Sequence, residues 1–300
     1  MLVHLVVAML AVPVPTPASG KESSSAVEVR IDAEHREVVV TAWPIHIPEA
    51  TLYHHHPSET YLRFQWPVRG WVRGYRLDLL DSGGRTLPRE MLHHAGVANL
   101  DRRQLPYPLV ERLLAVGRET RPVMLPASIG VPLAPGQQLL LYYALANATA
   151  SPIDGASLRL SMTWTPEGAN PPHDVFPLFL DANPKAAGAD TRAFDVPPGL
   201  SIMSAEFTLP VGGRLRALGG HLHDYAVEIR LEDVRTGKTL ARLTTKRHTD
   251  GRLIAVTSTR FVFKRGGLHL AANHQYRVIA VYDNPTSGTI LAERWPSWRA

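Results

Sequence analysis

Apolar and polar residues alternate with a period of two along much of the chain, as in a β-strand with one buried face. The alternation is clear at 27–31, around 38–40, at 75–79 and again at 158–162. The segment 139–145 is instead a continuous apolar run. These patterns predict that the first half of the chain is built almost entirely of strands.

The second half shows the same kind of pattern, with turn residues at short intervals. Gly237-Lys238 and Asp250-Gly251 are each expected to close a hairpin. Short strands separated by turns at this spacing are typical of a β-sandwich or a jelly roll. The strands expected here lie at 175–180, 205–209, 214–218, 227–231, 253–257 and 276–282.

One short segment favours a helix. Pro108 suits the first turn of a helix over 108–116, and Gly117 suits the position just past its end. We expect no other helix in the chain.

Length and composition indicate that these strands form two domains. Three hundred residues, 45% of them hydrophobic, are enough for two cores. The segment 165–172 contains three prolines and a glycine and is the best candidate boundary. We therefore predict an all-β protein with two tandem antiparallel jelly-roll or β-sandwich domains, at 27–165 and 172–300.

The first twenty residues differ from the rest. Residues 2–14 are apolar apart from His4, and 13–20 are mostly small, with a plausible cleavage region at 18–20. The apolar core is too short to span a bilayer. Residues 1–20 are thus predicted to be a cleaved signal peptide, so that the protein is secreted, periplasmic or on the cell surface, with no membrane span.

Charge and cysteine content narrow the possible functions. The net charge of +5 is spread along the chain without a dense Lys/Arg run, which indicates a solvated basic surface and no nucleic-acid partner. The absence of cysteine excludes disulfides and thiolate chemistry. Any metal must be held by His, Met, Asp, Glu or backbone groups.

The fourteen histidines form clusters, of which His221-Leu222-His223 is the most informative. On a strand, residues i and i+2 face the same side, so both imidazoles can reach one metal ion. Gly219-Gly220 would allow close approach, and Asp224 or Tyr225 could orient a ligand ring. Imidazole ligation without thiolate suits copper or zinc. Two exposed strand histidines remain the alternative.

The other clusters are weaker signals. His93 and His94 are adjacent, so joint ligation needs an irregular backbone or a strand end. The run 54–56 lies in a loop that could wrap onto a metal, although an exposed polar run is the commoner case. Serine-hydrolase, zinc-protease, P-loop and dinucleotide motifs are all absent from the sequence.

Four segments together resemble the copper type II ascorbate-dependent monooxygenases, the family of peptidylglycine α-hydroxylating and dopamine β-monooxygenase, and its bacterial members most closely. They occur in the family's order over residues 60–288. The segments are 91–94 with 99–103, 123–133 (VMLPASIGVPL), 219–225 (GGHLHDY) and 276–286 (YRVIAVYDNPT).

The resemblance implies two jelly-roll-like domains, each with one copper. His93 and His94 would match the electron-transfer copper, and His221 and His223 would match the copper at which O2 and substrate meet. The activity implied is hydroxylation of a C–H bond with O2 and an ascorbate-type reductant. The substrate, a small molecule or a peptide, stays open.

The sequence departs from the family at the third ligand of each copper. A third histidine is expected in the strand 139–147, where this chain has Ala144, Leu145 and Ala146. A methionine is expected after the Asn-Pro-Thr turn, but the last methionine is Met203. Three interpretations therefore remain: a monooxygenase, a non-catalytic copper-binding protein of the same fold, or an extracellular β-sandwich binding module.

Overall fold

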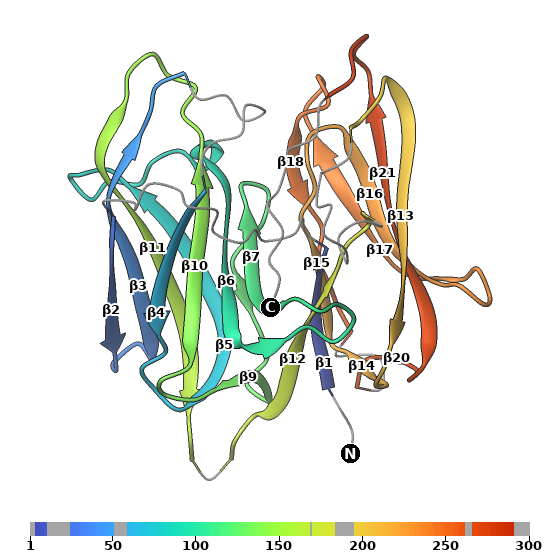
Figure 1. The fold of residues 1–300 in the computed structure, drawn as a ribbon, viewed down its shortest axis with the longest axis horizontal. Helices are drawn as coiled ribbons and strands as arrows, with labels where there is room; N and C mark the ends of the chain where they lie inside the picture. Colours follow the sequence, from blue (N-terminus) through green and yellow to red (C-terminus); the bar gives the residue numbers. More distant parts are fainter. Residues whose placement is uncertain are drawn as a thin grey trace. The chain divides into compact units, whose positions relative to one another are not determined.

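The computed structural model describes residues 4–10, 25–50, 59–168, 170–183, 195–261 and 266–290. In these ranges the chain forms β-strands and one 3-10 turn (Arg89–Met91), with no α-helix (Figure 1). The prediction of an all-β protein is confirmed. Since no α-helix occurs in the described ranges, none is available there that could cross a membrane.

The chain divides into two compact units. Unit 2 contains Ser19–Arg102 and Leu113–Val175, and unit 1 contains Met1–Ala18, Arg103–Arg112 and Phe176–Ala300. The chain passes between the units at 18–19, 102–103, 112–113 and 175–176. The boundary at 165–172 stays a prediction.

Unit 2 is built from two sheets. The first sheet has the order β9 (Ile129–Leu133), β5 (Gly70–Leu80), β11 (Ile153–Pro166), β3 (Glu37–Ile47), β2 (Ala26–Asp32). Strand β5 of this sheet also pairs with the short β8 (Val123–Met124). The second has the order β4 (Thr60–Gln65), β10 (Gln138–Leu145), β6 (Leu92–Arg103), β7 (Val110–Gly117).

The core of unit 2 follows the sequence pattern. Val38, Val40 and Ala42 alternate on β3 and are completely buried, while the intervening residues of β3 face the other side. The apolar run on β10 is buried along nearly its whole length, as expected for a strand covered on both faces. Burial of these aliphatic side chains stabilises the unit.

Unit 1 has one main sheet and several short strands. The main sheet has the order β13 (Gly199–Leu209), β21 (His274–Asn284), β16 (Ala226–Asp233), β17 (Thr239–Arg247), β18 (Leu253–Val256). The short strands are β1 (His4–Leu10), β14 (Gly213–Leu215), β15 (Ala217–Gly220), β19 (Thr259–Arg260) and β20 (Leu268–Leu270). Strand β12 (His173–Leu180) leads into this unit.

Both predicted hairpins of unit 1 are confirmed. Gly237 closes the β16–β17 turn at φ 66° and donates its N–H to the Asp233 carbonyl. Gly251 closes the β17–β18 turn at φ 87° and donates to the His248 carbonyl. Glycine suits both positions because a left-handed backbone carries no penalty without a Cβ atom.

The helix predicted over 108–116 is wrong. Residues Val110–Gly117 form strand β7, which joins the sheet beside β6. Pairing with β6 supplies the backbone hydrogen bonds that a helix would have made internally. Tertiary pairing has overridden the local signals at Pro108 and Gly117.

The segment predicted to be a signal peptide contains strand β1. It pairs in parallel with β15, with Ala8 opposite Leu218 and Leu10 opposite Gly220. Cleavage after residues 18–20 stays a prediction.

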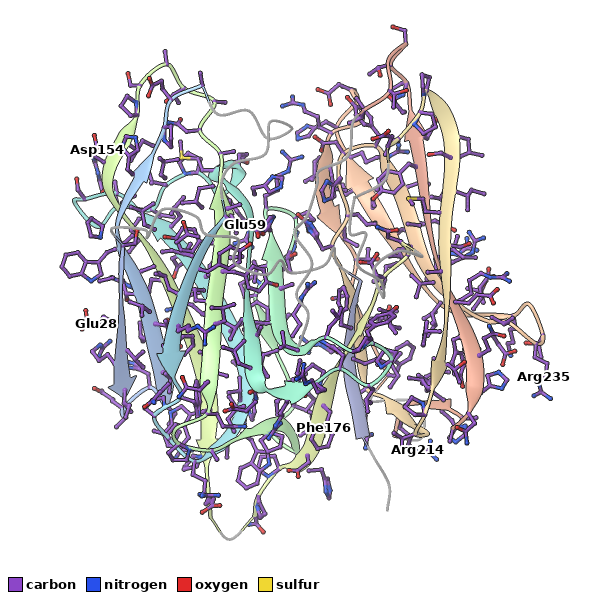
Figure 2. All side chains as sticks on the ribbon, in the orientation of Figure 1. Glu28, Glu59, Asp154, Phe176, Arg214 and Arg235 are labelled. Atoms are coloured by element: carbon purple, nitrogen blue, oxygen red, sulfur yellow. The ribbon has the colours of Figure 1, made fainter. Side chains whose placement is uncertain are left out.

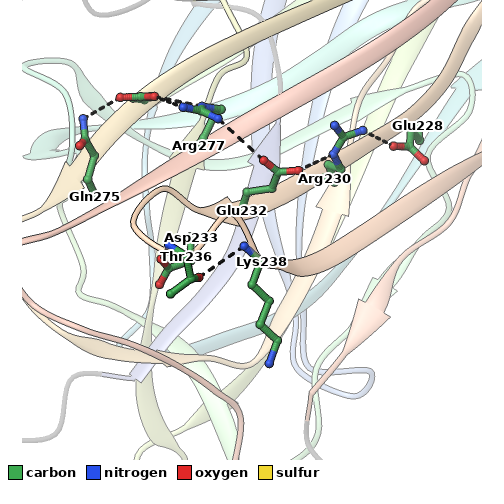
Figure 3. Close-up of polar contacts among 9 residues, drawn as sticks. Glu228, Arg230, Glu232, Asp233, Thr236, Lys238, Gln275 and Arg277 are labelled. Carbon is green, nitrogen blue, oxygen red and sulfur yellow. Dashed lines mark hydrogen bonds and ion pairs between the residues drawn. The ribbon is translucent and has the colours of Figure 1, made fainter.

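A row of alternating charges fixes the register of the main sheet of unit 1 (Figure 3). Arg230 donates to Glu232 at 2.7 Å and to Glu228 at 2.6 Å, and these two carboxylates raise the pKa of Arg230. Arg277 lies directly opposite both Glu232 and Glu206 on the neighbouring strands. A shift by two residues would place Arg277 opposite Arg230 in place of Glu232, so the network favours the observed pairing.

Candidate metal centres

His93 and His94 lie together at the start of β6 because the strand is irregular there. Ala144 of β10 pairs with His94, but the next residue, Leu145, pairs with Leu92. His93 is therefore the extra residue of a β-bulge, which turns adjacent side chains out of their usual alternation. The two ring centroids are 4.8 Å apart, and both side chains are buried. The irregular backbone that joint ligation requires is present.

A carboxylate orients one of these rings. Glu59 directly precedes β4 (labelled in Figure 2), and its Oε1 hydrogen bonds to Nε2 of His94. The Tyr61 hydroxyl donates to the other oxygen of Glu59. Carboxylate–imidazole pairs of this kind fix the orientation and tautomer of metal-binding histidines. Because Glu59 occupies Nε2, His94 would present Nδ1 to a metal ion.

The position directly opposite His94 is occupied by alanine. Ala144 is its cross-strand partner and is almost completely buried. Side chains of directly opposed residues lie on the same face of a sheet, so a longer side chain at 144 would reach the His94 ring. The histidines at 54–56 fall outside the described residues.

His221 and His223 lie together in unit 1, but they do not lie on a strand as expected. Strand β15 ends at Gly220, and the two histidines follow in a segment without regular secondary structure before the turn at 224–225. Their ring centroids are 5.1 Å apart, so both rings lie on one side of this segment. His221 is buried and His223 is half-buried.

The turn after this pair is held from two sides. The Leu253 N–H donates to Oδ1 of Asp224 at 2.6 Å, and the Tyr225 N–H donates to the Gly251 carbonyl at 3.0 Å. A Cβ atom at Gly251 would lie 2.6 Å from the Tyr225 ring, so glycine is required for this close approach. Asp224 thus anchors the histidine segment to the β17–β18 hairpin.

A buried carboxyl group that the sequence analysis missed lies near His221. Asp181 directly follows β12, is 6% exposed, and its Oδ2 has no hydrogen-bond partner among the described residues. Burial raises the pKa of Asp181 to about 7, against the opposing effects of the Asn183 N–H, Arg112 and His221. An acidic residue at the end of an apolar strand was the available signal, but its burial depends on tertiary packing.

The same turn recurs in the two units. Asn147 follows β10, and its Oδ1 accepts from the Thr149 N–H at 3.0 Å and from the Thr149 hydroxyl at 2.7 Å, while its Nδ2 donates to the Ser151 carbonyl at 2.9 Å. Asn284 ends β21 and makes the same three bonds, at the same lengths, to Thr286 and to the Gly288 carbonyl.

Each histidine pair lies near a strand that pairs with the strand leading into one of these turns. His93 and His94 lie near the start of β6, which pairs with β10 and has Leu92 opposite Leu145. His221 and His223 come just before β16, where Ala226 lies opposite Tyr282 of β21. The two units therefore carry their histidine pairs in similar parts of their sheets, within the strand in unit 2 and just before it in unit 1.

Each of the two candidate metal centres provides two imidazole side chains. Within the described ranges, no three His, Asp or Glu side chains converge as metal ligands would. A scan against known protein families matches no family model, and a search of curated proteins finds no match.

Proposed function

We propose that this chain is an exported copper-dependent monooxygenase-like protein with two jelly-roll domains, related to the ascorbate-dependent copper monooxygenases. One observation carries the proposal: each unit holds a histidine pair with adjacent rings, on or just before a strand that pairs with the strand leading into an Asn-x-Thr turn. Four ordered sequence segments of the chain resemble that family.

The side chains at the two histidine pairs are of a type that binds copper. Neutral imidazoles are good ligands for copper, and no thiolate competes for it. His93 and His94 would hold one ion, and His221 and His223 the other. Bound copper would supply O2 activation and electron transfer with an ascorbate-type reductant.

The protein's own groups prepare these ligands. Glu59 would hold the proton on Nε2 of His94 and leave Nδ1 facing the metal. Asp224 keeps the His221–His223 segment in place through the Leu253 N–H. Asp181 places a carboxyl group near His221, where its ionised form would favour a bound cation.

A second candidate is a non-catalytic copper-binding protein of the same fold. It is favoured by the small residue at the position opposite His94, where a third imidazole would fit. Metal analysis after purification and desalting tests both candidates together. We expect about one tightly held copper per chain, at His221 and His223, and a weaker second site. Purified protein that retains no copper after loading would contradict both.

Replacement of Ala144 by histidine should strengthen the site in unit 2. The new ring would lie on the same face as His94 and provide the third imidazole, so copper affinity should rise about tenfold or more. Copper titration followed by electron paramagnetic resonance measures the effect.

The matched control for Ala144→His is Leu145→His. Leu145 is the next residue of β10 and is also buried, but its side chain points to the other face. The control should not gain copper affinity. Equal gains in both variants, or no gain in Ala144→His with the fold retained, would contradict a site beside His94.

A further inference from the structure

A hollow of about 720 Å³ lies on the outer face of the first sheet of unit 2. It is formed by β2, β3, β11, part of β5 and the turn at 81–84, whereas His93 and His94 lie on β6 of the second sheet. It lies on the face opposite to the core residues of β3, since Val39 and Thr41 line it while Val38 and Val40 are buried inside.

The hollow is a trough because the middle of its two central strands carries mostly short side chains, with Arg159 of β11 between Ser157 and Ser161. Thr41 and Val39 of β3 and Ser157 and Ser161 of β11 form its floor. Longer side chains from β2 and β5 form its walls. The walls include Glu28 and Arg30 on one side and Arg76 on the other.

The strand register sets the polar groups in rows across the trough. Thr41 pairs with Glu28 on one side and with Arg159 on the other. Val39 pairs with Arg30 and with Ser161. From Glu37 to Trp43 the trough follows seven residues of β3, or about 20 Å. Hydrogen-bonding groups therefore repeat along an extended ligand site.

The charges in the trough are mixed and nearly balanced. Several are already paired, as in Arg76 with Glu37 and Arg30 with Asp32. A balanced surface has little attraction for a polyanion such as a nucleic acid or an acidic polysaccharide. The basic groups are Arg30, Arg76 and Arg159, and the acidic groups are Glu28, Asp32, Glu37 and Asp81.

Three side chains are available to a ligand. Trp43 lies at one end of the trough and is 49% exposed, which is unusual for a large apolar ring. Within the described part of the chain, neither Glu28 nor Arg159 forms an ion pair or a side-chain hydrogen bond. Figure 2 shows Glu28 on the outer side of β2, directed away from the rest of the sheet.

We propose that this trough binds a neutral oligosaccharide. The indole face of Trp43 would stack on the C–H face of one sugar ring, as its amphipathic ring favours. Glu28, Thr41 and Arg159 would exchange hydrogen bonds with hydroxyl groups, which both donate and accept.

A peptide fits this trough less well. The strands that form its floor are paired on both sides, so a peptide backbone finds no open edge for strand addition. The lining also offers no apolar pocket for peptide side chains. The trough lies on a different sheet of unit 2 from His93 and His94, so sugar binding there does not depend on the proposed function.

Binding should be tested by calorimetry with the metal-free chain and neutral hexasaccharides of glucose, xylose, mannose and N-acetylglucosamine. At least one should bind, and Trp43→Ala and Arg159→Ala should each weaken it about tenfold. The control Ile31→Ala removes an exposed apolar side chain of β2 on the other face and should leave the affinity unchanged.

Three results would overturn the inference. The first is the absence of binding to every neutral hexasaccharide. The second is binding that Trp43→Ala and Ile31→Ala change equally. The third is Trp43-dependent binding of oligogalacturonate or of an unstructured peptide when no neutral sugar binds.

Discussion

Replacing His221 and His223 together with alanine should abolish the tightest copper site of this chain. The two rings lie 5.1 Å apart, so a single ion can be bound by both. Removal of one partner that merely orients a ligand weakens a metal site 10- to 100-fold, so loss of two direct ligands should weaken it by about 100-fold or more. Copper titration by calorimetry measures the change.

The matched control removes two other imidazoles from the same unit. His248 and His269 are exposed and lie away from the histidine segment in the sequence. The variant His248→Ala/His269→Ala should keep the tight site. Circular dichroism shows whether both variants retain their β-sheet content. If the His221→Ala/His223→Ala variant binds copper with native affinity and stoichiometry, the assignment of this centre is wrong.

The largest effect on stability is expected from Asp181→Asn. Burial raises the pKa of Asp181 from 3.8 to about 7 in the folded chain. Between these values the folded chain holds a proton that the unfolded chain releases. The stability that this proton provides is complete below pH 4 and is lost as the pH rises to about 7. The shift corresponds to about 4 kcal/mol.

Asparagine has the same shape as aspartate, but its side-chain amide does not titrate. Its Oδ1 can still accept the Asn183 N–H, which lies 2.8 Å from Oδ1 of Asp181. The metal-free Asp181→Asn chain should therefore match the native chain near pH 4 and exceed its free energy of unfolding at pH 8. Urea unfolding at a series of pH values measures both curves.

Asp250 provides a control, because its pKa is shifted in the opposite direction from that of Asp181. The Arg252 N–H lowers the pKa of this exposed carboxyl group, so its ionised form favours folding and is lost as the pH falls. Asp250→Asn should change the pH dependence of the free energy of unfolding only at acidic pH. If Asp181→Asn leaves the native slope between pH 4 and 7 unchanged, Asp181 is not buried in the way described.

The parts of this fold that depend on local pattern were predictable from the sequence. The alternation on β3 gave the buried face, because a period of two by itself sends Val38 and Val40 to one side. The turns at Gly237 and Gly251 were predictable because their left-handed backbone demands glycine. The i, i+2 spacing of His221 and His223 predicted that their rings lie together, although the pair lies just past the end of β15 and not on a strand.

The parts that depend on neighbouring strands were not predictable in the same way. The bulge at His93 arises from the register between β6 and β10, which no window of sequence contains. Strand β7 forms because β6 offers it a partner, against the local helix signals. The pairing of Glu59 with His94 and the burial of Asp181 likewise join residues far apart in the chain.

The central claim is that the histidine pair of unit 1 holds a copper that reacts with O2. The most direct test is O2 uptake on addition of ascorbate to the copper-loaded, desalted chain, with copper content measured in the same samples. We expect the native chain and His248→Ala/His269→Ala to consume O2 at similar rates, and His221→Ala/His223→Ala to fall to the rate of buffer. Equal rates in the native chain and His221→Ala/His223→Ala would show that this histidine pair does not hold the reacting copper.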